Sequence, residues 1–121
     1  MAVDIEKLKY PIGRYQAPKK FTVAYKNECI SRIEALPKKL KKAVKGLKAN
    51  QLRTKYRPGG WTVRQLVNHI PDSHINAYVR FKWTLTEKTP TIKAYNEKLW
   101  VITNDVKSYD ITNTLLSLIH I

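Results

Sequence analysis

Apolar side chains recur every three or four residues between Val63 and Leu85, which is the spacing of one face of an α-helix. Thr62 stands just before this run and is a good N-cap residue, so the pattern predicts a long helix from Thr62 to about Glu87. Pro71 interrupts the run and predicts a kink near Val67 to Pro71, because proline lacks the N–H of the helical hydrogen bond. The apolar stripe consists of Val63, Leu66, Val67, Ile70, His74, Ala77, Tyr78, Phe81 and Leu85.

The rest of the chain also favours helices. Thr22 is a candidate N-cap for a helix that reaches about Leu36, and Pro37 predicts a kink or a new helix there. Between Pro37 and Leu47 the apolar residues share an arc about 100° wide, with lysines opposite. A short segment at 95–100 and a helix from Asp110 onward follow, and residues 1–20, which contain two prolines and a glycine, are predicted to form an extended arm. We therefore predict a single all-α domain over residues 1–121.

Charge adds a second possible function. The chain of 121 residues has 23 basic and 9 acidic residues, a net charge of +14, and the segment Lys19 to Lys55 alone carries +10. Such an excess favours anionic partners, and a lysine face over Lys38–Lys48 could bind nucleic acid or an acidic membrane. The ordinary alternative is a solvated helix face, and the segment lacks interleaved aromatic residues that would stack on bases. The candidate anion-binding residues are Lys38, Lys41, Lys42 and Lys45.

Cysteine usage and apolar runs bear on the compartment. Cys29 is the single cysteine, so an intramolecular disulfide is impossible, and this fits a reducing compartment. The first ten residues lack the apolar core of a signal peptide, and no apolar run reaches the roughly 20 residues that span a bilayer. We therefore expect a cytoplasmic protein without a membrane span.

Three histidines, His69, His74 and His120, are available as metal ligands. His69 and His74 lie five residues apart, about 140° around a straight helix, so they cannot bind one ion from the same face. His69 and Asp72 are three residues apart, a spacing that suits a ligand and a carboxylate that supports it. Periodicity alone favours a different assignment, with His74 buried in the apolar stripe and His69 at the surface.

A family resemblance covers roughly residues 8 to 100. The run from Tyr56 to Glu87, YRPGGWTVRQLVNHIPDSHINAYVRFKWTLTE, resembles the YfiT-type branch of the DinB superfamily, as do Tyr10-Pro11-Ile12-Gly13, the Leu36-Pro37 hinge and the segment from Pro90 to Trp100. The resemblance implies an up-down four-helix bundle, often a homodimer, with a divalent metal, nickel or zinc, on three histidines. Members are described as metal-dependent hydrolases, and some as bacillithiol S-transferases, in which a low-molecular-weight thiol attacks an electrophile.

The resemblance also implies roles for particular residues. The metal ligand of the second helix aligns with His69, which leaves His74 in the core or beside the ligand and Asp72 as the carboxylate that orients it. The family usually has a histidine where this chain has Asn68 and an alanine where it has Pro71. The other two ligands belong to a C-terminal helix.

The same comparison predicts an incomplete bundle. We expect the fourth helix to be missing and the third to be cut short, since family members usually exceed 150 residues. The final segment, Leu115 to Ile121, resembles a read-through artefact, and His120 aligns with a histidine that is not a ligand. We accordingly expect this chain alone to be inactive and not to hold the metal tightly.

Overall fold

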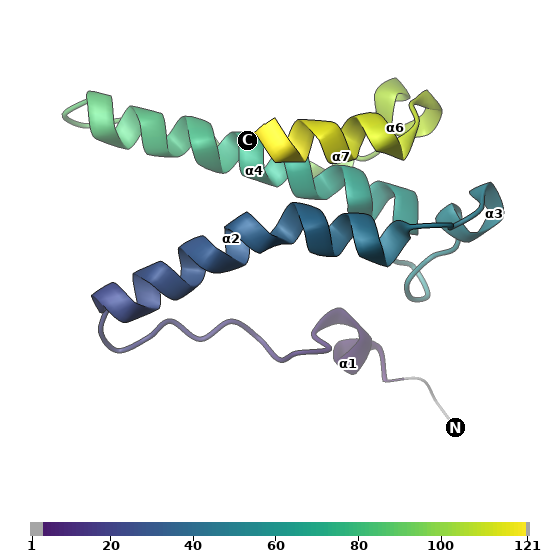
Figure 1. Cartoon of the computed structure of the whole chain (residues 1–121), viewed down its shortest axis with the longest axis horizontal. Helices are drawn as coiled ribbons and strands as arrows, with labels where there is room; N and C mark the ends of the chain where they lie inside the picture. The colour runs from purple at the N-terminus through teal and green to yellow at the C-terminus, as the bar shows by residue number, and fades with distance from the viewer. Residues whose placement is uncertain (1–3, 121) are drawn as a thin grey trace.

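The computed structural model describes residues 4–120. Its first long helix, α2 (Val23–Val44), begins at the predicted cap, where the Thr22 hydroxyl accepts a hydrogen bond from the Tyr25 amide at 3.1 Å. Pro37 lies inside this helix. The helix bends along its length but does not break (Figure 1). The predicted end near Leu36 was therefore wrong, because one proline removes a single backbone hydrogen bond and the turns on either side sustain the helix.

The second long helix, α4 (Val63–Thr86), has nearly the predicted bounds. Its first turn is closed by a capping box, in which Thr62 Oγ1 accepts from the Gln65 amide at 3.2 Å and the Gln65 side chain accepts from the Thr62 amide at 2.9 Å. Pro71 is buried within the helix, which continues through it as one element. The two reciprocal bonds satisfy amides that would otherwise be unpaired, which explains why the helix begins here.

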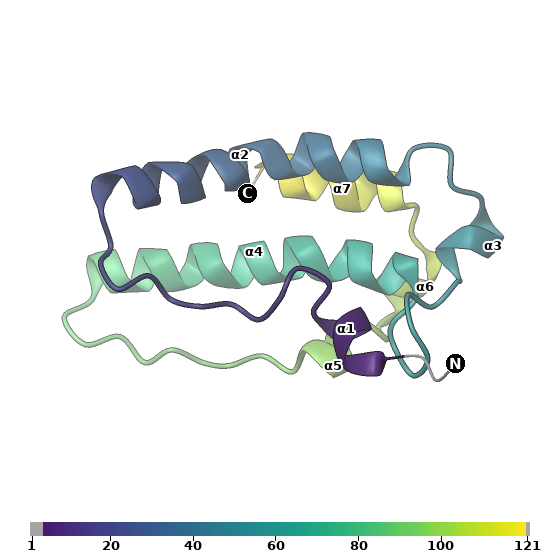
Figure 2. The same ribbon diagram turned by 90° about the horizontal axis from the view of Figure 1, so that it is seen from below.

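The remaining helices are short. The predicted third helix is present as α7 (Ile111–His120), and the predicted segment near Trp100 contains α5 (Glu97–Trp100). Three further helices were not predicted: α1 (Ile5–Lys9), α3 (Ala49–Leu52) and α6 (Asn104–Ser108). The N-terminal arm is thus a short helix followed by an extended chain that runs beside the bundle (Figure 2).

The three longest helices lie side by side, and α7 packs mainly on α4 and also on α2. Figures 1 and 2 show that α2 and α4 run in opposite directions, whereas α7 runs in the same direction as α4. The connection over residues 87–110 makes this possible, since it carries the chain back along α4 before α7 begins (Figure 2). The all-α class is confirmed, and the described residues contain only an isolated bridge between Lys55 and Thr62 in place of strands.

The buried core gathers at the end of the bundle where α4 begins. Its members come from α2, α3, α4, α6, α7 and the residue after α5, and they are Val44, Leu52, Val67, Val101, Val106 and Leu118. At the other end of α4 the apolar stripe is exposed, and the exposed fraction rises to 69% at Phe81 and 80% at Leu85. Only the first half of the predicted stripe therefore contributes to the core.

Over residues 4–120, no helix combines the length and the apolar character that crossing a membrane requires.

Candidate metal site

His69 lies on the second turn of α4, where its ring packs against the indole of Trp61. The ring centroids are 4.9 Å apart and the planes are inclined by 57°. Trp61 reaches this position through a turn, in which the Tyr56 amide donates to the Trp61 carbonyl at 3.1 Å and Gly59 adopts a φ of 66°. A positive φ of this kind favours glycine, so the Gly59-Gly60 pair allows the chain to fold Trp61 back over the helix.

One nitrogen of His69 has no partner. Nδ1 is buried and makes no hydrogen bond, while the residue as a whole is half-buried. Leaving a buried polar atom unpaired costs free energy, so such an atom calls for an explanation. A metal ligand is one explanation, because the coordinating nitrogen of a histidine must be free of other bonds.

The other two histidines differ from His69 in their surroundings. His74 is half-buried, and its Nδ1 donates to the Ile70 carbonyl at 2.8 Å, so this ring is tied to its own helix. His120 is exposed at the end of α7. Of the three histidines, His69 alone has a buried nitrogen without a partner.

Asp72 lies one turn after His69, in a hollow of about 280 Å³ between α4, α6 and α7. Burial raises the pKa of the Asp72 carboxyl, the nearby charge of Asp105 raises it further, and His69 acts in the opposite direction. No hydrogen bond joins Asp72 to His69 within residues 4–120. His69 is thus close enough to affect the charge of Asp72, although no hydrogen bond joins the two side chains.

We expect Asp72→Asn to stabilise the protein at neutral pH. The raised pKa means that the folded state disfavours the ionised carboxyl of Asp72. The protonated carboxyl therefore stabilises the fold at pH values below its unfolded pKa. This stabilisation is lost as the pH rises through the folded pKa. Asparagine has no charge to bury, and the gain should stay below about 1 kcal/mol because solvent screens part of the repulsion. Urea unfolding at pH 7 and pH 3 measures the change in the free energy of unfolding. A gain in stability that persists at pH 3 would show that the charge of Asp72 is not its cause.

The described residues do not supply a complete metal site. Within residues 4–120, no group of three histidine, cysteine, aspartate or glutamate side chains is placed to hold one ion. Catalytic zinc sites use three protein ligands and an open position. His69, with Asp72 nearby, fits one ligand and a supporting carboxylate of such a site, but not the full set.

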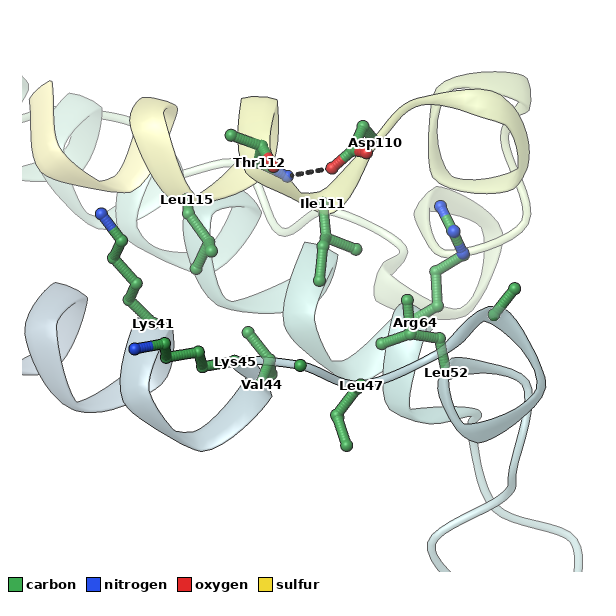
Figure 3. A pocket seen from close by; sticks show the side chains of 12 residues that line it. Lys41, Val44, Lys45, Leu47, Leu52, Arg64, Asp110, Ile111, Thr112 and Leu115 are labelled. Carbon is green, nitrogen blue, oxygen red and sulfur yellow. Dashed lines mark hydrogen bonds between the residues drawn. The ribbon is translucent and has the colours of Figure 1, made fainter.

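Three lysines of the alternative interface lie on α2 and the fourth, Lys45, directly follows its last residue. All four candidates, Lys38, Lys41, Lys42 and Lys45, are exposed. Two of them border a hollow of about 440 Å³ between α2 and α7, where Lys41 extends toward α7 (Figure 3). Asp110 lines the same hollow and accepts a hydrogen bond from the Thr112 amide at 2.7 Å. The exposure of the lysines and the acidic Asp110 beside them do not distinguish this face from an ordinary solvated one.

Two features of the site were not predicted from the sequence. The contact between Trp61 and His69 arises from the turn before α4, and the only signal for it was the Arg57-Pro58-Gly59-Gly60 break directly before Trp61. Asn68 is buried beside His69 and bonds across to α7, where Thr114 Oγ1 donates to its Oδ1 at 2.7 Å. That bond fixes the helix that carries His69 against its neighbour.

Comparison with known proteins gives three concordant results. The model of the DinB superfamily matches residues 32–118. The chain is 47% identical over 108 residues to "Putative metal-dependent hydrolase YfiT" of Bacillus subtilis (strain 168), covering 89% of this chain and 61% of the relative. It is also 47% identical over 114 residues to a protein of Bacillus cereus (strain B4264) with the same hydrolase designation, covering 93% of this chain and 66% of the relative.

A solved structure agrees with the sequence matches. It is described as "YfiT from Bacillus subtilis is a probable metal-dependent hydrolase with an unusual four-helix bundle topology". The two chains superimpose with a TM-score of 0.89 at 46% identity, covering 94% of this chain and 65% of that one. This chain thus spans somewhat less than two thirds of the length of the relatives it matches.

Proposed function

The chain belongs to the DinB superfamily, and from this premise we propose that it contributes one ligand, His69, to a metal-dependent hydrolase or transferase site of the YfiT type. The observation that supports the proposal is the buried Nδ1 of His69 without a hydrogen-bond partner. The relatives named as metal-dependent hydrolases make a divalent metal the natural partner for that site. Trp61 would hold the ring in place, and Asp72 would add negative charge nearby.

The proposal includes a finer description of the chemistry. The metal is nickel or zinc, the nucleophile is a low-molecular-weight thiol, and the second reactant is an electrophile. A bound divalent metal would hold the thiol as its thiolate, which is the nucleophilic form. Since the described residues provide a single histidine for the site, we propose that this chain alone neither turns over substrate nor retains metal against a chelator.

The test is a titration of the ¹⁵N-labelled chain with Ni²⁺, which broadens the NMR signals of nearby nuclei. We expect substoichiometric Ni²⁺ to broaden the ring signals of His69 before those of His74 and His120, because only His69 has a buried nitrogen free to coordinate. His69→Gln should remove the buried binding mode, whereas His120→Gln, a matched change at the surface, should leave it intact.

Two outcomes would count against this assignment. Equal broadening of all three rings would mean that Ni²⁺ binds the histidines without regard to the site. One equivalent of nickel or zinc retained per chain after dialysis against a chelator would overturn the expected weak binding. Such a result would indicate that a second copy of the chain supplies ligands. We propose that the protein forms a homodimer, in which this could occur.

A nucleic-acid or membrane-binding function gains no support from the structure or from the names of the relatives. The four lysines are exposed side chains on a helix face, and the hollow beside them also contains Asp110. We therefore put forward the metal-dependent function alone.

A further inference from the structure

Arg80 presents a second buried polar atom without a partner. Its Nε is shielded from solvent and makes no hydrogen bond, and one Nη donates to the Lys93 carbonyl at the long distance of 3.4 Å. A guanidinium carries five N–H donors and is always charged, so a buried donor left unpaired is costly. Lys93 belongs to the connection that returns along α4 (Figure 2), so the bond from Arg80 links that helix to the connection.

Arg80 lines a cavity of about 530 Å³, a volume within the range of small-molecule sites. One wall is formed by α4 and the other by residues 93–100. Three aromatic residues line it, and two of them, Tyr95 and Trp100, pack with ring centroids 4.9 Å apart and planes inclined by 59°. The full lining, which we call the Arg80 pocket, is Ile75, Asn76, Val79, Arg80, Trp83, Lys93, Ala94, Tyr95, Asn96 and Trp100.

The charged side chains that line the Arg80 pocket are cationic, although two carboxylates lie near its Tyr95 wall. Arg80 and Lys93 are cationic, and none of the lining residues is acidic. Burial raises the pKa of the Tyr95 hydroxyl, and the nearby carboxylates of Glu97 and Asp72 raise it further, so the hydroxyl stays neutral and can donate a hydrogen bond. Two asparagine side chains add further donors and acceptors. The aromatic walls thus suit a flat apolar ligand, and the unpaired Nε–H donor of the Arg80 guanidinium suits an anionic group on it.

We propose that the Arg80 pocket binds an aromatic monocarboxylate, with the carboxylate on the Arg80 guanidinium and the ring between Trp83, Tyr95 and Trp100. A carboxylate matches the forked geometry of the guanidinium and carries one negative charge. A phosphate monoester would bring nearly two charges into a largely apolar cavity and would cost more to desolvate. Arg80 follows His69 by eleven residues, roughly 16 Å along a helix, so the carboxylate would bind well away from the proposed metal ligand.

The test uses 2-naphthoate as the probe and 2-naphthylmethanol as its neutral counterpart. We expect naphthoate to quench tryptophan fluorescence, to shift the Arg80 Nε–H NMR signal and to bind about tenfold or more tightly than the alcohol, since a charge-assisted hydrogen bond contributes on this scale. Arg80→Gln should lose that preference, and Arg80→Lys should keep only part of it because it lacks the fork.

The matched control is Arg32→Gln, which removes the same charge from an exposed position on α2. It should leave naphthoate binding unchanged. The proposal is overturned if the alcohol binds as tightly as naphthoate, if Arg80→Gln binds like the native chain, or if naphthoate fails to shift the Arg80 signal. Should Arg80→Gln fail to fold, the shift of the Arg80 Nε–H in the native chain decides the matter. None of these results depends on Ni²⁺ binding at His69, so the two proposals fail separately.

Discussion

Leu118→Ala is expected to lower the free energy of unfolding by about 3 kcal/mol, because it leaves a cavity where α7 docks on α4. Leu118 is 4% exposed, and α7 contacts α4 more extensively than any other helix does. Helix α7 has only ten residues, too few to be stable alone, so its helical state depends on this packing. Urea unfolding followed by circular dichroism at 222 nm measures the loss.

Leu116→Ala is the matched control for this prediction. Leu116 lies on the same helix, carries the same side chain and is 51% exposed, so its truncation should cost less than about 1 kcal/mol. A similar loss for both leucines would show that α7 does not dock through Leu118. A small loss for both would show that the buried core does not extend to α7.

The helix boundaries that depend on local chemistry could be predicted from the sequence. Thr22 and Thr62 were identified as N-caps from residue type and position, and both accept the expected amide hydrogen bond. The effect of Pro37 was overestimated, since packing can hold a helix together across one missing bond. Helices of four or five residues, such as α3 and α6, span barely one turn and leave no periodicity to detect.

The direction of α7 depends on information that no local pattern contains. Periodicity shows which residues share a face, but not where a connection of more than twenty residues leads the chain. The crossover along α4 places α7 parallel to it, and it also forms one wall of the Arg80 pocket. The pocket was missed for the same reason, because its two walls, residues 75–83 and 93–100, meet only through the path of the loop between them.

The periodicity of apolar residues predicted the surroundings of His74 but did not identify His69 as the candidate metal ligand. The apolar stripe placed His74 among buried residues, and the structure shows its ring bonded to the Ile70 carbonyl. His69 lies off that stripe, and only the family resemblance indicated it as a ligand. Its distinguishing property, a buried and unpaired Nδ1, depends on the turn that brings Trp61 over the ring.

Different residues of helix α4 therefore serve the packing of the bundle and the two proposed sites. Asn68 and Val67 are buried and hold it in the bundle, while Phe81 and Leu85 leave an apolar surface open to solvent. His69 and Arg80, eleven residues apart, lie about 20° from each other around an ideal helix. Both carry a buried nitrogen without a hydrogen-bond partner, and a bound ligand would explain each of them.

Asn68→Ala is expected to cost about 2 kcal/mol of stability, because it removes two partly buried hydrogen bonds at once. The Asn68 side chain accepts from Thr114 on α7 at 2.7 Å and donates to the Arg64 carbonyl at 2.9 Å. Thr114→Val keeps the shape of the side chain but removes the donor, so it should cost about 1 kcal/mol and leave the Asn68 oxygen unpaired. The double variant should lose less than the two single losses combined, since both variants remove the same bond.

Thr112→Val provides the control for this cycle, because Thr112 is exposed on the same helix and should change stability by less than about 0.5 kcal/mol. Additive losses for Asn68 and Thr114 would mean that the bond between α4 and α7 does not form in solution.

Neighbouring residues on a helix point about 100° apart, so Asn68 is directed toward α7 while His69 packs on Trp61. Asn68→Ala should consequently weaken the bundle without changing the order in which Ni²⁺ broadens the histidine signals, which separates the residue that holds α4 in place from the one that we propose binds metal.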